Sequence, residues 1–493
     1  MGIIDYIFQR KKKKLKLSIA QKPIVKVPDL IFNQGFDALN DMLKYNIAPP
    51  LGDHSDIWTR PAPKFPGAYL WDSSFISQAW KIWDPTIGLR ALKAFVDFQQ
   101  PDGRMPHMVF WGKKVSELSN PPFLTWAVRN LLSYYPNQKF ADFFIEPISN
   151  FMKWRKKARY NENAGLYYWK HSYESGIDNS PRFTSIDESE KYNVDKLGAI
   201  DLNSEIVLQH QAFLDLTEEF NQAHSYRNEA KNELQRLTDK VNISLWDKKR
   251  GIFGDLDFTS NNLKTIDTIA SYFPLIFNKL PEPIKKKLLS SLEDPSKYNT
   301  KIPTPTVARN SEYFVKDMWR GPVWMNTSYL IVKGMERQGK EKLAADFAYR
   351  LCKGVYYTWD NKGHFYEFYD PERYDLKELN RKKGNFMKKI TLGPKPVIDF
   401  AGWTADVNPL LIENIIGIKK EKGGWILSPH LPTDWMKLKG KMVKATLPFF
   451  DLDLQYIINS DQTTLEVDVR LLENSFKGNL SNHEKIKLDK LKK

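Results

Sequence analysis

The most regular feature of the chain is the helical spacing of its apolar positions. Within residues 89–98, apolar side chains recur every three or four positions, as they do along one face of an α-helix. The same spacing recurs in residues 206–220, 230–241, 284–292, 329–335 and 343–351. The pattern therefore predicts a mainly α-helical protein from about Leu30 onward.

The predicted helices are separated by loops rich in Pro, Gly, Asn and aromatic residues, such as residues 100–107 and 319–324. Helix pairs that alternate with such loops indicate a toroid of helical hairpins with its loops gathered at one end. Binding and catalytic groups concentrate on loops of this kind. The spacing between successive helices is irregular, so we expect no short strict repeat.

The pattern changes after about residue 423. Residues 446–458 and 463–471 are rich in alternating apolar positions, and Ser460-Asp461-Gln462 between them fits a hairpin turn. The expected organisation is a basic N-terminal arm at residues 1–27, a helical domain at 28–422, a small antiparallel β unit at 423–476 and a basic tail at 477–493.

Composition adds a first indication of chemistry. Aromatic residues make up 13% of the 493 residues and include 15 Trp. Such a surplus suits walls that stack on the apolar faces of sugar rings, although a large helical core that absorbs them is the alternative. The single cysteine, Cys352, excludes an intramolecular disulfide framework and a zinc finger.

The net charge of +15 raises the question of a nucleic-acid partner. Much of the excess lies at the ends, in residues 10–14 and 485–493, and the interior contains no recognisable nucleic-acid module. We therefore expect solvated tails and no specific nucleic-acid partner, with weak contact of the tails to anionic surfaces as a secondary hypothesis.

No stretch approaches the roughly 20 apolar residues of a membrane span, and the N-terminus lacks the order of a secretory signal, so the expected location is cytoplasmic.

Asp178 lies in a loop with polar neighbours of the kind that a general acid needs. Glycoside hydrolysis requires one protonated carboxyl group, which gives its proton to the leaving oxygen, and one ionised carboxyl group. Gly176 and Pro181 favour a turn over a helix around Asp178, and Asn179 and Arg182 are candidates to orient the carboxyl group or a substrate. An Asx turn that caps the next element is the alternative.

Glu367 is the second candidate carboxylate. Four aromatic residues surround it between Gly363 and Pro371, and apolar walls of this kind shift the pKa of a carboxyl group. A strand that merely exposes Glu367 is the alternative.

Two further loops offer groups that bind sugars. Asp72 follows Trp71 and is a candidate to hold hydroxyls while the indole stacks on the ring, although an N-cap role for Asp72 or Ser73 is equally natural there. Arg320, in the loop at 319–324, is a candidate to hold a hydroxyl or an anionic aglycone.

Together these segments resemble the ordered motifs of glycoside hydrolase family 63, which shares a clan of (α/α)6 barrels with the trehalases. The likeness is greatest to the compact bacterial and archaeal members, including the mannosylglycerate and glucosylglycerate hydrolases, and extends from about Gly67 to Pro409. The motifs that carry it are residues 69–73, 102–107, 121–127, 174–182, 201–205, 319–324, 365–371 and 402–405.

The resemblance implies an (α/α)6 barrel and an α-glycosidase that inverts the anomeric configuration of α-linked glucose or mannose without a metal or other cofactor. It implies that Asp178 protonates the glycosidic oxygen and that Glu367 activates water. It places Trp71, Asp72, Trp319, Arg320, Trp324 and Trp403 in the sugar pocket. The remaining predicted substrate contacts are Tyr69, His107, Trp126, Asn179 and Arg182.

Two features depart from the family pattern. Asn120 precedes a Pro-Pro pair where many relatives have Gln, and residues 372–399 form a basic insertion where relatives usually connect faster. The insertion is a candidate to cover the mouth of the pocket or to reshape the site for the aglycone. Two alternatives remain open: a trehalase or oligosaccharide α-glucosidase, and a sugar-binding protein on an inactive barrel.

Overall fold

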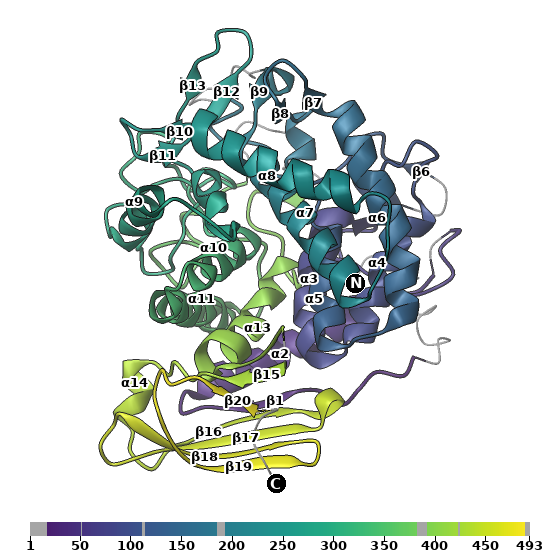
Figure 1. The fold of residues 1–493 in the computed structure, drawn as a ribbon. Helices are drawn as coiled ribbons and strands as arrows, with labels where there is room; N and C mark the ends of the chain where they lie inside the picture. The colour runs from purple at the N-terminus through teal and green to yellow at the C-terminus, as the bar shows by residue number, and fades with distance from the viewer. Residues whose placement is uncertain are drawn as a thin grey trace.

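The computed structural model describes residues 17–50, 52–110, 114–184, 193–381, 392–422 and 424–488. Helices are the main regular structure up to Ile416, joined by loops and by strands of two or three residues, and longer strands follow (Figure 1). The α-helices of this region are α2 (Leu30–Tyr45), α3 (Leu70–Trp83), α4 (Pro85–Asp97), α5 (Leu124–Tyr134), α6 (Gln138–Ala158), α7 (Ile200–Glu219), α8 (Arg227–Ser244), α9 (Glu282–Glu293), α10 (Met325–Arg337), α11 (Glu341–Lys362) and α13 (Val407–Leu410). They are joined by the 3-10 helices η3 (Ile269–Ile276) and η4 (Trp403–Asp406) and by the π-helical segment η5 (Leu411–Ile416).

The helices predicted from apolar spacing are confirmed. Each predicted stretch lies in α4, α7, α8, α9, α10 or α11, to within one residue at its end. None of the helices in the described part of the chain is long and apolar enough to cross a membrane.

Helices α3, α5, α7, η3, α10 and α13 form a closed ring, in which each packs on the next and α13 packs on α3. Each ring member is preceded in the chain by a helix of a second set, namely α2, α4, α6, α8, α9 and α11. Burial separates the two sets: α3 is buried along its whole length, whereas α8 buries only Ala230, Glu233, Leu237 and Val241. A helix that is buried all round belongs to the interior of a large protein, and one with a single buried face belongs to its outside.

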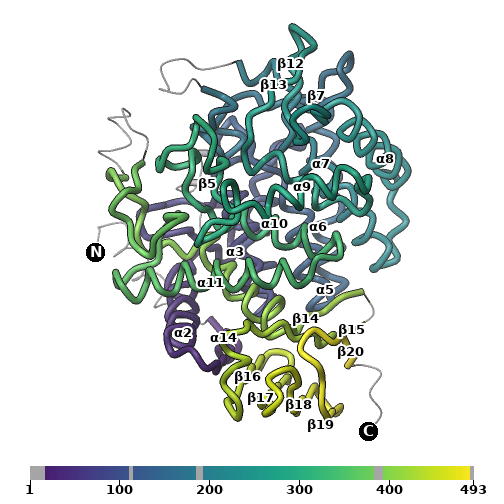
Figure 2. Tube along the Cα trace, turned by 90° about the vertical axis from the view of Figure 1, so that its left-hand side faces the viewer, coloured from purple at the N-terminus to yellow at the C-terminus, as the bar shows by residue number. Residues whose placement is uncertain are grey.

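A five-stranded antiparallel sheet and a three-stranded sheet form the C-terminal β unit, which lies at one end of the helical region (Figures 1 and 2). The larger sheet has the order β1-β16-β17-β18-β19 and the smaller β14-β15-β20. The strands are β1 (Ile24–Lys26), β14 (Ile418–Glu421), β15 (Gly424–Leu427), β16 (Met442–Leu447), β17 (Leu452–Ile458), β18 (Thr464–Leu471), β19 (Asn474–Ser481) and β20 (Ile486–Lys487). At the contact with the ring, Tyr134 at the end of α5 packs against Trp425 and Phe450.

The predicted β segments are present, with one break. Buried and more exposed side chains alternate along β17 and β18, as expected of strands with one face on a core. Residues 460–462 lie in the turn that joins them, where the carboxylate of Asp461 accepts bonds from the backbone N–H groups of Thr463 and Thr464 at 2.8 and 2.9 Å. The stretch 446–458 is two strands, because Pro448 begins a 3-10 turn between β16 and β17.

Both predicted tails are wrong in part, because each supplies strands to the β unit. Residues 24–26 of the expected arm form β1, in which Val25 pairs with Ala445 and is buried. Residues 477–481 of the expected tail continue β19, and β20 follows at 486–487. Such short, charged strands are stabilised by their neighbours in the sheet, so that local patterning does not reveal them. The basic clusters at 10–14 and 490–493 lie outside the described residues.

A row of buried ion pairs links the ring to the β unit. Lys81 on α3 and Lys333 on α10 both bind the carboxylate of Glu413 on η5, at 2.5 and 2.8 Å. Lys333 also binds Glu336, and Glu336 in turn contacts Lys419 on β14. Burial raises the pKa of Glu413, but the two lysines outweigh it and lower the value to about 2.

The substitution Glu413→Gln is expected to lower the free energy of unfolding by about 3–5 kcal/mol, because it leaves the buried ammonium group of Lys81 without its ion-pair partner and removes one of the two carboxylates that bind Lys333. Thermal unfolding followed by circular dichroism measures the effect. The matched control is Glu218→Gln, which breaks a surface pair with Lys422 at 3.2 Å and should cost no more than about 1 kcal/mol. Because the folded-state pKa is lowered, the stabilisation is complete above the ordinary value of 4.5 and is lost as the pH falls toward 2. Equal losses in the two variants would contradict the prediction.

Candidate active site

A cavity of about 320 Å³ opens among the loops that lead into the ring helices α3, α5, α7, α10 and α13. It brings Asp178 and Glu367 together from loops far apart in the sequence. The described residues that line it are Phe65, Tyr69, Trp71, Asp72, His107, Met108, Asn120, Tyr173, Gly176, Asp178, Met318, Trp319, Trp324, Glu367, Arg381, Leu392, Phe400 and Trp403.

Four tryptophans form the apolar wall of this cavity. Trp319 stacks on Trp324 with ring centroids 3.7 Å apart, and Trp71 stacks on Trp319 at 5.7 Å. Trp403 lies against Trp71 and donates its indole N–H to the backbone carbonyl of Glu367 at 2.8 Å. The indole N–H of Trp71 is buried and has no hydrogen-bond partner among the described residues. An aromatic wall suits a sugar ring, which presents apolar faces.

Tyr69, Asp72 and His107 also line the cavity, and the rings of Tyr69 and His107 lie edge to face with centroids 5.9 Å apart. Helix α3 begins at Leu70 without a side-chain cap, so that Asp72 lies in the first turn and the alternative N-cap role is excluded. Burial raises the pKa of Asp72 to about 8, which keeps the carboxyl group protonated at neutral pH and able to donate a hydrogen bond. Asn120 lines the same region and donates to the backbone carbonyl of His107 at 3.4 Å.

Glu367 is held through its backbone and its side chain. Its N–H donates to the carbonyl of Val397 at 3.1 Å, and the N–H of Val397 donates to Oε2 of Glu367 at 3.4 Å. The Glu367 side chain is 6% exposed, and the guanidinium group of Arg381 contacts its Oε2. These contacts fix one carboxylate at the edge of the aromatic wall.

Comparisons with known proteins identify the family. The model of a mannosylglycerate hydrolase MGH1-like glycoside hydrolase domain matches residues 65–381. The chain is 23% identical to the mannosylglycerate hydrolase of Thermus thermophilus over 376 residues, which is 62% of this chain and 89% of that one. It also matches the structure of a family 63 mannosylglycerate hydrolase from Thermus thermophilus in complex with glucose, with a TM-score of 0.63 and 21% identity over 76% of this chain and 99% of that chain. The chain belongs to glycoside hydrolase family 63.

A further relative of this glycoside hydrolase is the glucosylglycerate hydrolase of Mycolicibacterium hassiacum. The two are 20% identical over 410 residues, which is 65% of this chain and 90% of that one. The family thus contains relatives named for either of two sugars.

Asn179 and Arg320 were predicted to contact substrate. In the structure they hold the Asp178 loop against the loop at residues 319–324, called here the tryptophan loop. The side-chain oxygen of Asn179 accepts the backbone N–H of Trp319 at 3.0 Å, and the backbone carbonyl of Asn179 accepts from Nε of Arg320 at 2.8 Å. Arg320 also contacts Thr184. Both side chains are buried outside the cavity lining, so the structure assigns them to loop positioning.

Arg182 and Trp126 also lie away from the cavity lining. The guanidinium group of Arg182 is buried between Asp201 and Asp255, at 2.8 and 2.7 Å, and these two carboxylates occupy the donors that a substrate would need. Trp126 packs against Phe75 and lines a different cavity, beside Lys81. Arg182 therefore anchors the Asp178 loop, and Trp126 supports the core beneath the wall.

Sequence reasoning missed Arg381, which comes from the basic insertion at 372–399. Burial lowers the pKa of Arg381 to about 10, against the opposing influence of Asp178 and Asp317, so the group remains a cation at neutral pH. Leu392 of the same insertion also lines the cavity. The described part of the insertion therefore shapes the site, whereas residues 382–391 lie outside the described residues.

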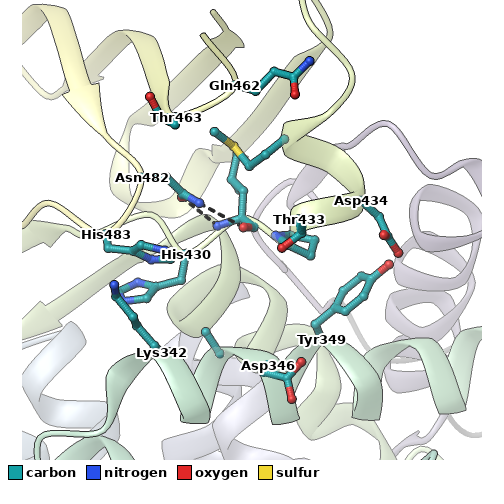
Figure 3. A pocket seen from close by; sticks show the side chains of 14 residues that line it. Lys342, Asp346, Tyr349, His430, Thr433, Asp434, Gln462, Thr463, Asn482 and His483 are labelled. Atoms are coloured by element: carbon teal, nitrogen blue, oxygen red, sulfur yellow. Dashed lines mark hydrogen bonds between the residues drawn. The ribbon is translucent and has the colours of Figure 1, made fainter.

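A second cavity, of about 480 Å³, lies between α11 and the β unit (Figure 3). His430 and His483 lie side by side there, with ring centroids 4.8 Å apart, and Asp346 and Asp434 lie across from them. Asp346 already binds Arg350 at 2.7 Å, and Asp434 is exposed to solvent. Catalysis by carboxyl groups depends on desolvated acids that lie beside apolar walls, and neither Asp346 nor Asp434 is placed in this way. The tryptophan-lined cavity is therefore the candidate active site.

Gly176 has a specific structural role in that site. Its φ is +71°, and an added Cβ would lie 1.9 Å from the ring of Trp71. The absence of a side chain therefore lets the Asp178 loop pack directly on the tryptophan wall.

Gly176→Ala is expected to lower the kcat/KM of glycoside hydrolysis by about 100-fold, because displacement of the Asp178 loop by roughly 1 Å misplaces the catalytic geometry. Steady-state hydrolysis assays measure the effect. The matched control is Gly339→Ala, which carries the same backbone strain at φ +75° but meets nothing within 4 Å. Equal activity in the two variants would show that contact with Trp71 has no part in the site.

Proposed function

We propose that this glycoside hydrolase is an inverting α-glycosidase, with Asp178 as general acid and Glu367 as general base. The observation that carries the proposal is the meeting of both residues in one tryptophan-lined cavity, where Glu367 is almost fully desolvated beside a cation. The substrate proposed is an α-mannoside or α-glucoside with a small aglycone. A cavity of about 320 Å³ supports this choice, because it is near the lower end of the range for small-molecule sites.

In the proposed reaction, Glu367 takes a proton from a water molecule, and the water oxygen attacks the anomeric carbon from the face opposite the leaving group. The bond between the anomeric carbon and the glycosidic oxygen breaks as Asp178 gives its proton to that oxygen. One water is consumed, and the enzyme is left with Glu367 protonated and Asp178 ionised until solvent exchange restores both. A single displacement of this kind inverts the anomeric configuration.

The surrounding groups have complementary proposed roles. The wall formed by Trp71, Trp319, Trp324 and Trp403 excludes water and stacks on the sugar. Protonated Asp72 donates a further hydrogen bond. Tyr69 and His107 complete the polar side of the cavity.

The arrangement of helices supports interpretation of the ring as an (α/α)6 barrel. Ring and outer helices alternate along the chain, and α3, α7 and α10 each pack on the outer helix that follows, α4, α8 and α11, as the two helices of a hairpin do. The loops that enter the ring members supply the cavity, which is the placement that such a barrel gives its active site.

Asp178→Asn and Glu367→Gln are each expected to lower kcat by about 10²–10⁴-fold, the usual contribution of one acid or base. The assay panel is mannosylglycerate, glucosylglycerate, trehalose and kojibiose, and sugar release is measured. Asp434→Asn, in the second cavity, is the matched control and should retain full activity. Undiminished hydrolysis in either of the first two variants would contradict the proposed roles.

A proton NMR time course tests the stereochemistry. An α-linked substrate is expected to release the β-anomer first, because water attacks from the opposite face. Initial release of the α-anomer would instead indicate a covalent intermediate and would exclude Glu367 as a general base acting through water.

A further inference from the structure

Glu174 is a buried carboxylate that lies just outside the candidate active site. Its neighbours Tyr173, Gly176 and Asp178 line the cavity, whereas Glu174 is fully buried and is not among the described residues of the lining. It ends the short 3-10 turn η1 (Ser172–Glu174). A buried carboxylate is destabilising unless donors surround it, so the partners of Glu174 indicate what it does.

Each carboxylate oxygen of Glu174 accepts two hydrogen bonds. Oε1 accepts from the backbone N–H of Ser119 at 3.1 Å and from the guanidinium group of Arg159 at 2.7 Å. Oε2 accepts from Nε of Arg159 and from the backbone N–H of Lys170, both at 2.9 Å. Burial raises the pKa of Glu174, but the bonds from Arg159 and the charge of Arg155 outweigh it and hold the pKa below 4.5. Glu174 is therefore ionised at neutral pH and is bound by three separate segments.

The contact with Ser119 ties Glu174 to the loop before α5. Asn120, the next residue of that loop, lines the cavity. Leu118, the residue before it, accepts the backbone N–H of His107 at 2.9 Å. One oxygen of Glu174 therefore holds the segment that carries Asn120 and supports His107 on the polar side of the cavity.

The end of α6 supports both loops. Arg155, in the last turn of α6, donates to the hydroxyl of Ser119 at 3.1 Å and to the backbone carbonyl of Asn120 at 2.7 Å. Arg159 is the C-cap of the same helix and binds Glu174 through two N–H groups. A bidentate contact between a guanidinium group and a carboxylate fixes direction as well as distance. The Asp178 loop and the Asn120 loop are thus both held against one helix end.

The short stretch of chain between Glu174 and Asp178 is itself fixed. The hydroxyl of Ser175 donates to the backbone carbonyl of Ser172 at 2.6 Å and accepts the N–H of Ile177 at 3.1 Å. These two bonds close a tight turn around Ser175. A displacement of Glu174 is therefore passed along this turn to Asp178.

We propose that Glu174 is a positioning residue whose carboxylate holds the Asp178 loop and the Asn120 loop in one fixed relation, so that the general acid meets the glycosidic oxygen of a bound substrate. The inference rests on the proposed function and adds to it the group that sets the place of the acid. Glu174 acts through Asp178 and takes no part in bond making or breaking.

The test compares two kinds of substrate that differ in their need for an acid. A glycoside requires a proton on its leaving oxygen, whereas the fluoride of a glycosyl fluoride leaves with little help from a general acid. The substrates are mannosylglycerate and glucosylglycerate, each paired with the α-fluoride of the same sugar. The measured quantity is the ratio of kcat/KM on the glycoside to kcat/KM on the fluoride. A loss of folded enzyme lowers both values equally and leaves this ratio unchanged.

Glu174→Gln is expected to lower the ratio, because an amide cannot accept all four of the hydrogen bonds that the carboxylate accepts. On the glycoside, kcat/KM should fall at least about tenfold, which is part of the 10²–10⁴-fold that a general acid contributes, and on the fluoride by less than about threefold. An unchanged ratio in this variant would overturn the proposal.

Glu233→Gln is the matched control. Glu233 on α8 is also a buried, ion-paired carboxylate, bound by Arg236 at 2.6 Å and by the hydroxyl of Tyr167 at 2.7 Å, but it is not among the described residues that line the cavity. Its substitution should lower the melting temperature and leave the ratio at the wild-type value. A fall of the ratio in Glu233→Gln equal to that in Glu174→Gln would overturn a specific role for Glu174.

Glu174→Asp separates the span of the side chain from its charge. The shorter carboxylate keeps the negative charge beside Arg159 but cannot reach Arg159 and Ser119 together. We expect a smaller loss of thermal stability than in Glu174→Gln and again a lowered ratio. A wild-type ratio would reduce Glu174 to a counter-charge and overturn the proposal. If Glu174→Gln does not fold, Glu174→Asp provides the test. If neither folds, Arg159→Lys does so, because it keeps both charges and removes the bidentate contact.

Asp178→Asn keeps the inference distinct from the proposed function. It should show the largest fall of the ratio, because it removes the acid itself. A wild-type ratio in Asp178→Asn would defeat the proposed function. A lowered ratio in Asp178→Asn, together with an unchanged one in Glu174→Gln, would overturn the role of Glu174 alone.

Discussion

The ring helices are surrounded by protein on nearly every side, and this constraint determines where the buried charges of the molecule find their partners. A charged group on such a helix costs several kcal/mol of desolvation unless a counter-charge lies beside it. At the end where the ring meets the β unit, Glu413 receives Lys81 and Lys333. At the end where the loops enter, Asp201 at the start of α7 receives Arg182. The need of each buried charge for a counter-charge thus holds the β unit at one end of the ring and the Asp178 loop at the other.

The candidate active site is built from loops that are braced mainly against one another. Asn179 and Arg320 connect the Asp178 loop to the tryptophan loop, while Val397 and Trp403 hold the backbone and side chain of Glu367. The N–H donors and carbonyl acceptors of these loop residues are already engaged in hydrogen bonds between the loops. The wall residues are left with broad apolar faces and few available polar groups, which is the surface that a sugar ring requires.

The local pattern of apolar and polar residues predicted the helices and strands that bury one face against the core. The spacing of apolar side chains identified α4 and α7–α11, and the alternation in β17 and β18 identified the core of the β unit. The resemblance to a family also brought Asp178, Glu367 and the four tryptophans into one site. It did not separate residues that contact the cavity from residues that support it, because Arg182 has the composition expected of a ligand and its partner Asp255 lies far along the chain. Arg381 was missed because nothing in the insertion shows which basic side chain turns inward.

The pairing of β1 with β16 has a consequence for the order in which the molecule is assembled. Residues 24–26 emerge from the ribosome before any ring helix, yet their partner, residues 442–447, is made only after all of the ring helices. Until then, the backbone of β1 has no neighbouring strand, and the apolar side chains of Val25 in β1 and Val27 just after it have no sheet to cover them. The edge strand of the sheet is therefore added only after the ring has been translated, and a segment made early reaches its final place late.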